Sequence, residues 1–345
     1  MRAVLLAFLG ALLLAGCGPA QPLHQESFVF GTRVELLIAG APEEQARAAG
    51  NQVLAEFDRL HRTYHAWQPS ELSTLNAALA AGRTQQVSDE FAGYLREAQE
   101  IARAGDYLFD PGIGRLIEAW GFHSDEIQPH IPPPAELAAL VAQHPSIADL
   151  HLDGSPVSSR NRALALDFGG YLKGVALDRA AAILKAAGIR NALINIGGNI
   201  LALGDKNGVP WRVGIQHPRP ETVGGAPLAS LELHDGEAIG TSGDYQRYFM
   251  ADGLRYSHLI DPRTGRPAQG AQAVTLLIPP GPQAGMRSDA LSKPVFIAGA
   301  DWQAMAQKLG VTAVLKVGAD GTVQATPAMR QRLKIEAPNV RFAEP

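Results

Sequence analysis

Residues 164–174 read Leu-Ala-Leu-Asp-Phe-Gly-Gly-Tyr-Leu-Lys-Gly, and this segment joins two backbone patterns. Apolar residues alternate up to Phe168, which predicts a strand. The pair Gly169-Gly170 then turns the chain, and the residues that follow predict a helix to about Ala187, with Gly188 at its end. A strand that leads through two glycines directly into a helix is typical of a protein that mixes strands and helices.

The same turn has the features of an anion site. Free N–H groups at a helix start attract phosphate, and glycine lets a ligand approach the backbone closely. Lys173 adds a positive charge one turn into the helix, and Asp167 at the strand end can bind a ribose hydroxyl, a base edge or a cation. No Gly-x-Gly-x-x-Gly fingerprint is present. The segment alone leaves two interpretations open: a phosphate-binding turn, or a turn that needs glycine only for its backbone angles.

Strand and helix patterns extend outward from this segment over most of the chain. We expect helices to begin at Pro42, at Ser88 as N-cap and after the proline cluster 132–134, and a last helix to span about 289–310. The expected strands outnumber the helices and are joined by short turns such as Asp153-Gly154, which favours an α+β fold of mixed sheets with flanking helices over a doubly wound parallel sheet. The expected strands lie at about 32–38, 191–196, 211–215, 228–233, 274–278 and 311–317.

Composition narrows the class of protein. The chain has 345 residues, of which 46% are hydrophobic and 19% are charged, and this balance is typical of a globular protein. The net charge is -4 and no block of lysine or arginine occurs, so we expect no nucleic-acid partner. Anionic small molecules need only a local positive site, and the overall charge does not argue against them.

The N-terminus has the pattern of a bacterial lipoprotein signal. A positive start is followed by an apolar run too short to span a bilayer well, and then by Leu14-Ala15-Gly16-Cys17. We expect a signal peptide over residues 1–16, lipid on Cys17 and a tether over residues 17–25. The alternative is an ordinary signal peptide with an incidental cysteine. Cys17 is the single cysteine, so no disulfide forms within the chain.

Two further segments contain side chains suited to catalysis. His258, in the block 256–267, is suited to general acid or base chemistry. Asp289, at or just before a predicted helix, either offers a carboxylate to magnesium or simply caps that helix. The sequence disfavours a Ser-His-Asp hydrolase because no Gly-x-Ser-x-Gly elbow is present, and it disfavours a zinc site because the histidines are scattered.

In this order, and after such a signal, these segments resemble the ApbE family, whose members are FAD:protein FMN transferases. The resemblance covers about Phe28 to Arg332, and it implies one ApbE-type domain over residues 26–335 with the active site in a cleft between lobes. The matching motifs are Phe30-Gly31-Thr32, Phe109-Asp110-Pro111 with Gly114, Trp120-Gly121-Phe122, residues 167–178, Ile196-Gly197-Gly198-Asn199, Thr241-Ser242-Gly243-Asp244-Tyr245 and residues 257–267.

The resemblance also implies a set of site residues. His258 and Asp289 would act in catalysis. Magnesium would be held by the main-chain oxygen of Gly170, by Asp289, and by the turn at Ser292 and Lys293. The flavin and its nucleotide tail would lie near Phe30, Tyr64, Leu108, Phe109, Asp110, Asp167, Lys173 and Ile260.

Three positions depart from the usual pattern of the family. Phe30 stands where methionine is common. Lys293 stands where a small residue or threonine is usual, and because an ammonium cannot ligate magnesium, only its main-chain oxygen could serve. Pro294 follows directly, so we expect the helix in this region to begin later than is usual.

The implied reaction transfers FMN from FAD to a threonine or serine of a partner protein, uses magnesium and releases AMP. Two alternatives share the same sequence features: a magnesium-dependent FAD pyrophosphatase, in which water replaces the acceptor hydroxyl, and a non-catalytic flavin-binding lipoprotein. Lipid on Cys17 would hold the folded part on the periplasmic side of a membrane. The family favours the inner membrane, and Gly18 leaves the outer membrane open.

Overall fold

A computed structural model describes residues 21–124, 126–220, 225–338, 340 and 342–343. The predicted signal peptide and Cys17 lie outside the described residues. Strand β1 (Leu23–Val29) begins inside the predicted tether, so that prediction was too long by residues 23–25. These residues are held because β1 pairs along its whole length with β2 (Thr32–Ala39). None of the described helices combines the length and the apolar character needed to cross a membrane.

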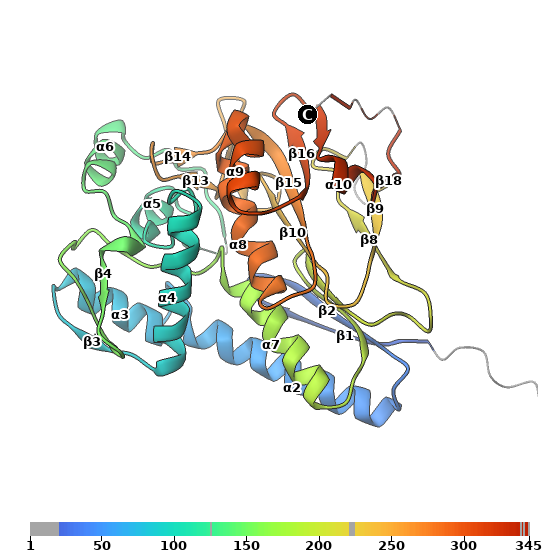
Figure 1. Cartoon of the computed structure of the whole chain (residues 1–345). Helices are drawn as coiled ribbons and strands as arrows, with labels where there is room; N and C mark the ends of the chain where they lie inside the picture. The colour runs from blue at the N-terminus through green and yellow to red at the C-terminus, as the bar shows by residue number, and fades with distance from the viewer. Residues whose placement is uncertain (1–20, 125, 221–224, 339, 341, 344–345) are drawn as a thin grey trace, which may run out of the picture.

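An eight-stranded sheet runs through the molecule in the order β1-β2-β6-β7-β10-β15-β16-β17 (Figure 1). All of its neighbouring strands are antiparallel. In β6 buried and half-buried side chains alternate at every residue, as the two-residue period of a strand requires. The six strands that follow β2 in this sheet are β6 (Asn191–Ile196), β7 (Asn199–Leu203), β10 (Ala238–Gly243), β15 (Ala271–Ile278), β16 (Ala313–Gly318) and β17 (Val323–Ala325).

Hydrophobic cores form on both faces of this sheet. Leu201 of β7 belongs to the larger core, which also contains Phe57 of helix α2 (Glu43–Thr63). Its neighbour Ile200 belongs to a second core on the opposite face. A three-stranded sheet covers that opposite face and consists of β8 (Trp211–Ile215), β9 (Ala229–Leu233) and β18 (Lys334–Ile335). The fold is therefore α+β with several sheets and flanking helices, as predicted, and the named strands of these sheets pair antiparallel.

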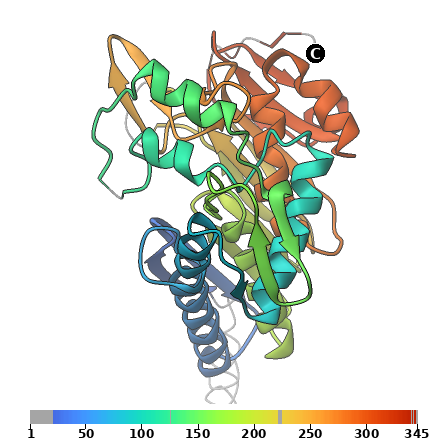
Figure 2. The ribbon, with the colours of Figure 1, turned by 90° about the vertical axis from the view of Figure 1, so that its left-hand side faces the viewer.

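A second part of the molecule is formed by the chain between α2 and α7 (Leu172–Ala186), seen on the left in Figure 1 and facing the viewer in Figure 2. Helix α7 itself packs on α2 and on β6 and β7 of the large sheet. The elements of the second part are α3 (Glu71–Ala80), β3 (Gln85–Gln86), α4 (Asp89–Ala104), α5 (Gly114–Ala119), α6 (Pro134–Ala142), η1 (Ile147–Asp149), β4 (Leu150–Leu152) and β5 (Pro156–Ser159). Ser88 caps helix α4 as predicted, because its Oγ accepts the N–H of Phe91 at 3.2 Å.

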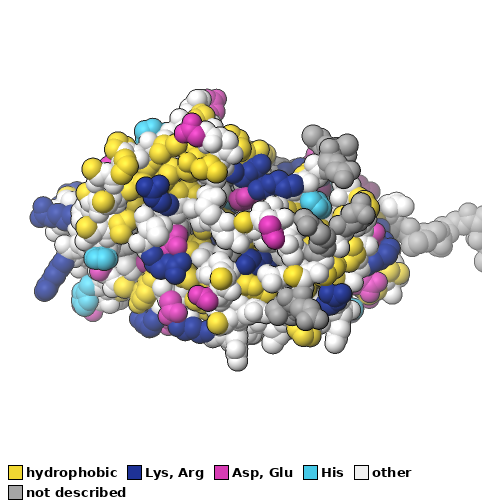
Figure 3. Space-filling model, turned by 90° about the horizontal axis from the view of Figure 1, so that it is seen from above, with side chains coloured by type: hydrophobic (Ala, Val, Ile, Leu, Met, Phe, Trp, Pro, Cys, Tyr) yellow, Lys and Arg dark blue, Asp and Glu magenta, His cyan; other side chains and the backbone are white. Residues whose placement is uncertain are grey.

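The remaining elements lie between the sheet strands or after them. They are the hairpins β11 (Tyr248–Ala251) with β12 (Leu254–Ser257) and β13 (Ile260–Asp261) with β14 (Arg266–Pro267), and the helices α8 (Ala284–Ile297), η2 (Gly299–Asp301), α9 (Trp302–Lys308) and α10 (Pro327–Arg330). On the surface seen in Figure 3, basic and acidic side chains are interspersed, in keeping with the small net charge.

The strand predicted to end at Phe168 is not part of a sheet. Ala165 forms one isolated bridge with Ile113, and the other backbone groups find different partners. The Asn76 side chain accepts the N–H of Leu166 at 2.7 Å and donates to the carbonyl of Leu166 at 2.9 Å. On the other side, Ala165 and Asp167 bond the main chain of residues 111–114. The segment therefore has an amide side chain on one side and a short irregular stretch of main chain on the other, and the sequence pattern does not reveal this.

Helix α8 contradicts the expectation of a later start. It begins at Ala284, so Asp289 lies within the helix and does not cap it. Pro294 lies inside α8, where its ring packs closely against Gly105. The predicted continuous helix over 289–310 is in fact interrupted after α8, because Gly299 takes a positive φ of 62°.

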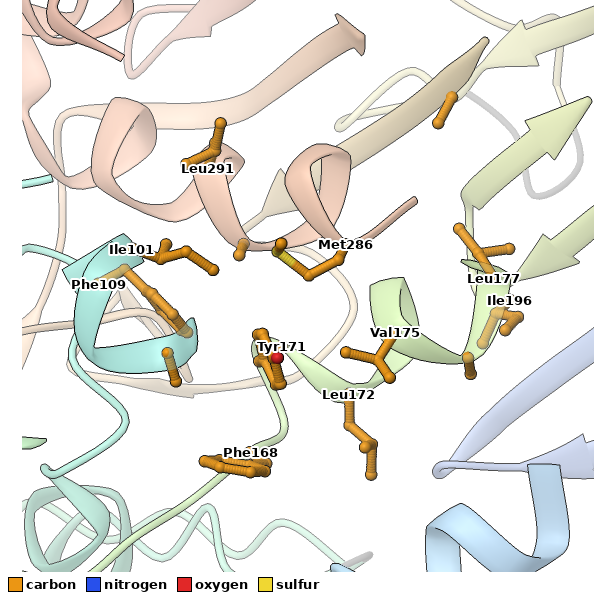
Figure 4. Packing of buried hydrophobic residues seen from close by; sticks show 14 of the residues in the cluster. Ile101, Phe109, Phe168, Tyr171, Leu172, Val175, Leu177, Ile196, Met286 and Leu291 are labelled. Atoms are coloured by element: carbon orange, nitrogen blue, oxygen red, sulfur yellow. The ribbon is translucent and has the colours of Figure 1, made fainter. Parts of the chain in front are cut away.

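Glycines bring α7 and α8 into close contact. A Cβ added to Gly174 of α7 would lie 2.5 Å from the Cα of Met286 and 2.7 Å from the carbonyl oxygen of Gly285, both in α8. Figure 4 shows Met286 between α8 and Val175 of α7. Almost every residue of α8 is buried, because α8 packs on α7 and on sheet strands β10 and β15. This contact fixes the position of Asp289.

We predict that Gly174→Ala destabilises the protein by about 3 kcal/mol, because overpacking against backbone atoms is difficult to relieve. Gly93→Ala is the matched control: Gly93 also lies within a helix, and a Cβ there meets no atom within 4 Å. This control is expected to be neutral or to stabilise by roughly 0.5–1 kcal/mol. Urea unfolding measures both free energies, and equal stabilities for the two variants would contradict the close-contact interpretation.

Candidate functional site

One cavity collects segments that are far apart in the sequence. It encloses about 1490 Å³, a volume that includes the open solvent at its mouth. Its walls come from both parts of the molecule, so the site lies between them as predicted. The lining segments lie within residues 30–31, 61–67, 108–122, 167–173, 197–199, 241–247, 258–260 and 289–297.

The cavity brings together all of the predicted site residues except Ser292. The hydroxyl of Ser292 lies behind the wall and is 2.7 Å from the hydroxyl of Ser242, which does line the cavity. The predicted residues that line it are Phe30, Tyr64, Leu108, Phe109, Asp110, Asp167, Gly170, Lys173, His258, Ile260, Asp289 and Lys293.

Phe30 is held over the cavity by an unusual turn. Phe30 and Gly31 connect β1 to β2 with φ of 57° and 67°, as a type I′ hairpin turn requires. A positive φ is strained for an aromatic residue and is a feature of functional sites. The ring of Phe30 lies 6.0 Å from that of Phe57 and 5.7 Å from that of His61. Neighbouring strands therefore fix an aromatic surface at the edge of the cavity.

Two predicted acids hold the backbone that shapes the cavity. Asp110 Oδ1 accepts the N–H groups of Gly112 at 2.7 Å and Ile147 at 2.8 Å. Asp167 Oδ1 accepts the N–H of Gly169 at 2.7 Å, which orders the glycine turn before α7. Burial raises the pKa of both carboxyls, and these hydrogen bonds oppose that rise.

Lys173 and Gly170 occupy the start of α7. Lys173 donates from Nζ to the carbonyl of Gly169 at 2.8 Å, so its charge stays at the turn. Gly170 is packed tightly: an added Cβ would lie 3.1 Å from the Phe109 ring and 3.2 Å from Cε of Lys293. A side chain at this second glycine would therefore need Phe109 or Lys293 to shift by a few tenths of an ångström.

Asp289 is fully buried, and its carboxylate is held by two neighbours. Its Oδ2 accepts the N–H of Gly174 at 2.9 Å, and its Oδ1 contacts the Lys293 ammonium. Burial alone would raise the pKa of the Asp289 carboxyl, but Lys293, Lys173 and the Gly174 N–H hold that pKa below its usual value. Burial lowers the pKa of Lys293 to about 8, although Asp289 opposes this change. The two residues form an ion pair within one helix.

His258 lines the same cavity as this pair. Its Nδ1 is 3.2 Å from the main-chain carbonyl of Arg247. A carbonyl oxygen only accepts, so this hydrogen bond requires the proton on Nδ1 and leaves Nε2 with a free lone pair. Burial, together with the charges of Arg247, Lys173 and Lys293, lowers the pKa of His258 to about 3. The imidazole is therefore neutral at pH 7 and can accept a proton.

Arg247 is a residue of the site that the sequence motifs did not single out. Its Nη2 donates to the carbonyls of Phe122 at 3.0 Å and Ser124 at 2.9 Å, and the residue lines the cavity. It lies between two recognised motifs, and that position is the only signal in the sequence. Trp67, also missed, lies at the cavity with its ring 6.4 Å from that of His123.

Aromatic side chains, a glycine turn at a helix start and three cations surround one deep cavity, which defines a site for a phosphate-bearing aromatic ligand. Residues 30–315 match the ApbE family, and the chain belongs to this family.

Several proteins of this family are similar to the chain over long stretches. The FAD:protein FMN transferase of Rhodobacter capsulatus is 44% identical over 335 residues, which is 95% of this chain and 62% of that protein. The chain thus spans less than two thirds of that relative. The FAD:protein FMN transferase of Vibrio cholerae is 31% identical over 306 residues, which is 87% of this chain and 88% of the relative.

Solved structures of the family share the fold. The crystal structure of the ApbE protein from Thermotoga maritima superimposes with a TM-score of 0.81 at 28% identity, covering 90% of this chain and 99% of that chain. The flavin transferase ApbE from Vibrio cholerae gives a TM-score of 0.77 at 28% identity, covering 91% of this chain and 100% of that one.

Proposed function

We propose that this chain is an FAD:protein FMN transferase that attaches FMN to a threonine or serine of an acceptor protein and releases AMP. The proposal rests on the presence of apolar, aromatic and cationic side chains in the lining of one cavity. The ring of Phe30 and the apolar side chains Leu108, Phe109 and Ile260 line the cavity together with Lys173, Arg247 and Lys293. A flavin joined to a pyrophosphate matches this lining, because its ring system packs against apolar and aromatic side chains and its phosphates are attracted to cations.

The reaction is a phosphoryl-type displacement. The acceptor hydroxyl oxygen forms a bond to the phosphorus of the FMN half, and the bond from that phosphorus to the bridging oxygen breaks. AMP leaves with that electron pair, and the hydroxyl proton passes to a base. The main tasks of the protein are to hold the reacting groups in line and to neutralise developing charge. We assign charge neutralisation to Lys173, Arg247 and Lys293, and proton acceptance to Nε2 of His258.

Magnesium remains a prediction from the family resemblance, and the residues present do not fit it well. A magnesium ion bound in the cavity would be held by carboxylate and carbonyl oxygens and would draw charge from the phosphates. In this chain the ammonium of Lys293 contacts Oδ1 of Asp289 and lies 2.7 Å from the main-chain oxygen of Asp289. The hydroxyl of Ser292 also donates to that main-chain oxygen, at 2.7 Å. No step is therefore assigned to a metal.

A transfer assay tests the proposal. The purified chain is incubated with FAD, magnesium and a candidate threonine-bearing flavoprotein domain, and mass spectrometry detects the added mass of FMN on the domain. Labelled domain supports the transferase. FMN and AMP in solution without label, across several candidate domains, would favour the pyrophosphatase. Intact FAD throughout would contradict both enzymes and favour a flavin carrier.

His258→Ala is expected to slow FMN transfer on the order of 100-fold, the range for loss of a general base. His151→Ala, an exposed histidine on β4, is the matched control and should leave the rate unchanged. A rate within about threefold of the parent, under 1 kcal/mol, would remove His258 from the mechanism.

The pH profile gives an independent check on His258. Its folded pKa is depressed to about 3 from an ordinary value of 6.5, so His258 is already deprotonated at neutral pH and stays so down to about pH 3. The kcat/KM profile should therefore show no ionisation of this group near pH 6.5. The unfolded chain takes up the proton below pH 6.5, so the contribution of His258 to stability is complete above that pH and is lost as the pH falls.

The localisation is proposed from the sequence alone. We propose that Cys17 carries lipid and holds the folded part on the periplasmic side of the inner membrane. The support is the small-residue motif before a single cysteine. Cys17→Ser is expected to release the chain from the membrane fraction, measured by immunoblot after fractionation. Retention of this variant in the membrane would contradict lipid anchoring at Cys17.

A further inference from the structure

The Lys293 ammonium lies where the family resemblance places a metal ion. Lys293 and Asp289 are four residues apart in α8, which brings their side chains to one face of the helix. Nζ of Lys293 contacts Oδ1 of Asp289 and lies 2.7 Å from the main-chain oxygen of Asp289. Cε of Lys293 also lies against Gly170. The ammonium thus contacts Asp289, and the side chain that carries it lies against Gly170; both residues were predicted to hold magnesium.

The Asp289 oxygens are satisfied without a metal. Oδ2 accepts the Gly174 N–H at 2.9 Å, and the main-chain oxygen accepts the Ser292 hydroxyl at 2.7 Å in addition to Lys293. A divalent ion bound at Oδ1 would lie beside a buried ammonium and be repelled by it. The Asp289 carboxylate is therefore already paired with a cation, the Lys293 ammonium.

We propose that the Lys293 ammonium is the fixed cation of this site and replaces a divalent metal, so that the chain binds FAD and transfers FMN without magnesium. This inference rests on the proposed function, since it names the source of positive charge at the same site. Lys293 lines the cavity while paired with Asp289, and Lys173 and Arg247 line it too. Three side-chain cations thus face the phosphates. Asp289 acts as a positioning residue, because it orients the ammonium.

The experiment compares the purified chain with Lys293→Thr, which exchanges the ammonium for an uncharged oxygen that can ligate a metal. FMN transfer by the parent chain should persist in excess chelator and change less than twofold on adding magnesium. Transfer by Lys293→Thr in chelator should fall on the order of 100-fold, as for loss of one electrostatic stabiliser, and should recover with magnesium. A parent chain that is inactive in chelator and active with magnesium would overturn the proposal.

A second readout does not depend on activity. Calorimetric titration with magnesium alone should give no binding heat with the parent chain and a saturable heat with Lys293→Thr. Saturable magnesium binding by the parent would overturn the inference, as would identical titrations for both chains. If no variant transfers FMN under any condition, the proposed function fails, while this titration still decides whether Lys293 replaces the metal.

Two further variants test whether a loss of transfer comes from a loss of stability. Lys293→Met keeps the approximate length of the side chain, removes its charge and, unlike Lys293→Thr, supplies no oxygen for a metal, so its transfer should be weak and should not recover with magnesium. Because it leaves the buried Asp289 unpaired, it is also expected to melt at a lower temperature. Asp289→Asn/Lys293→Met removes both charges and should recover the melting temperature without recovering transfer. Full metal-free transfer by this double variant would overturn the role of the ammonium.

Discussion

The site depends on the contact between helices α7 and α8, and in particular on the hydrogen bond from the Gly174 N–H to Asp289. Only glycine lets the two backbones approach closely enough, since a Cβ on Gly174 would lie 2.5 Å from the Cα of Met286. That approach brings the first turn of α7, with Lys173, against the middle of α8, where Asp289 and Lys293 lie. An ion pair buried among such neighbours is stable because both charges are paired and hydrogen-bonded; either alone would be strongly unfavourable. The ion pair between Asp289 and Lys293 therefore depends on the close packing of α7 against α8.

Local signals in the sequence predicted the elements whose stability is local. Ser88 caps its helix as expected, and β2 and β6 follow the alternation of apolar residues. The predictions that were wrong concern partners distant in sequence. The segment 164–168 has strand-like alternation, yet the Asn76 side chain bonds the N–H and carbonyl of Leu166, while Ala165 and Asp167 bond the main chain of residues 111–114; no local pattern encodes these partners. Pro294 was expected to delay a helix, but α8 begins ten residues earlier, at Ala284, because its buried surroundings outweigh the local penalty.

The motifs and the geometry give different information about the same residues. The family motif placed Asp110 and Asp167 beside the ligand, and the cavity does contain them, but their hydrogen bonds show that each also holds the backbone of a turn. Arg247 belongs to no recognised motif and nevertheless orients His258 through its carbonyl oxygen. A main-chain contact of this kind does not depend on the side chain, so it leaves little trace in a sequence. The motifs thus identified the region of the site, whereas the role of each residue became clear only from its hydrogen bonds in the structure.

The charges of the cavity also explain why its histidine stays neutral. Lys173, Arg247 and Lys293 act on His258 in the same direction as burial, so protonation of the imidazole is opposed from several sides. An anionic ligand needs those cations, and a proton acceptor needs to remain unprotonated beside them. The same electrostatic field meets both requirements, because positive charge that stabilises phosphate also disfavours a positive imidazole. In the proposed reaction a bound pyrophosphate would neutralise part of that field, and the pKa of His258 would then rise toward its ordinary value. The imidazole would thus become a better base once the substrate is in place.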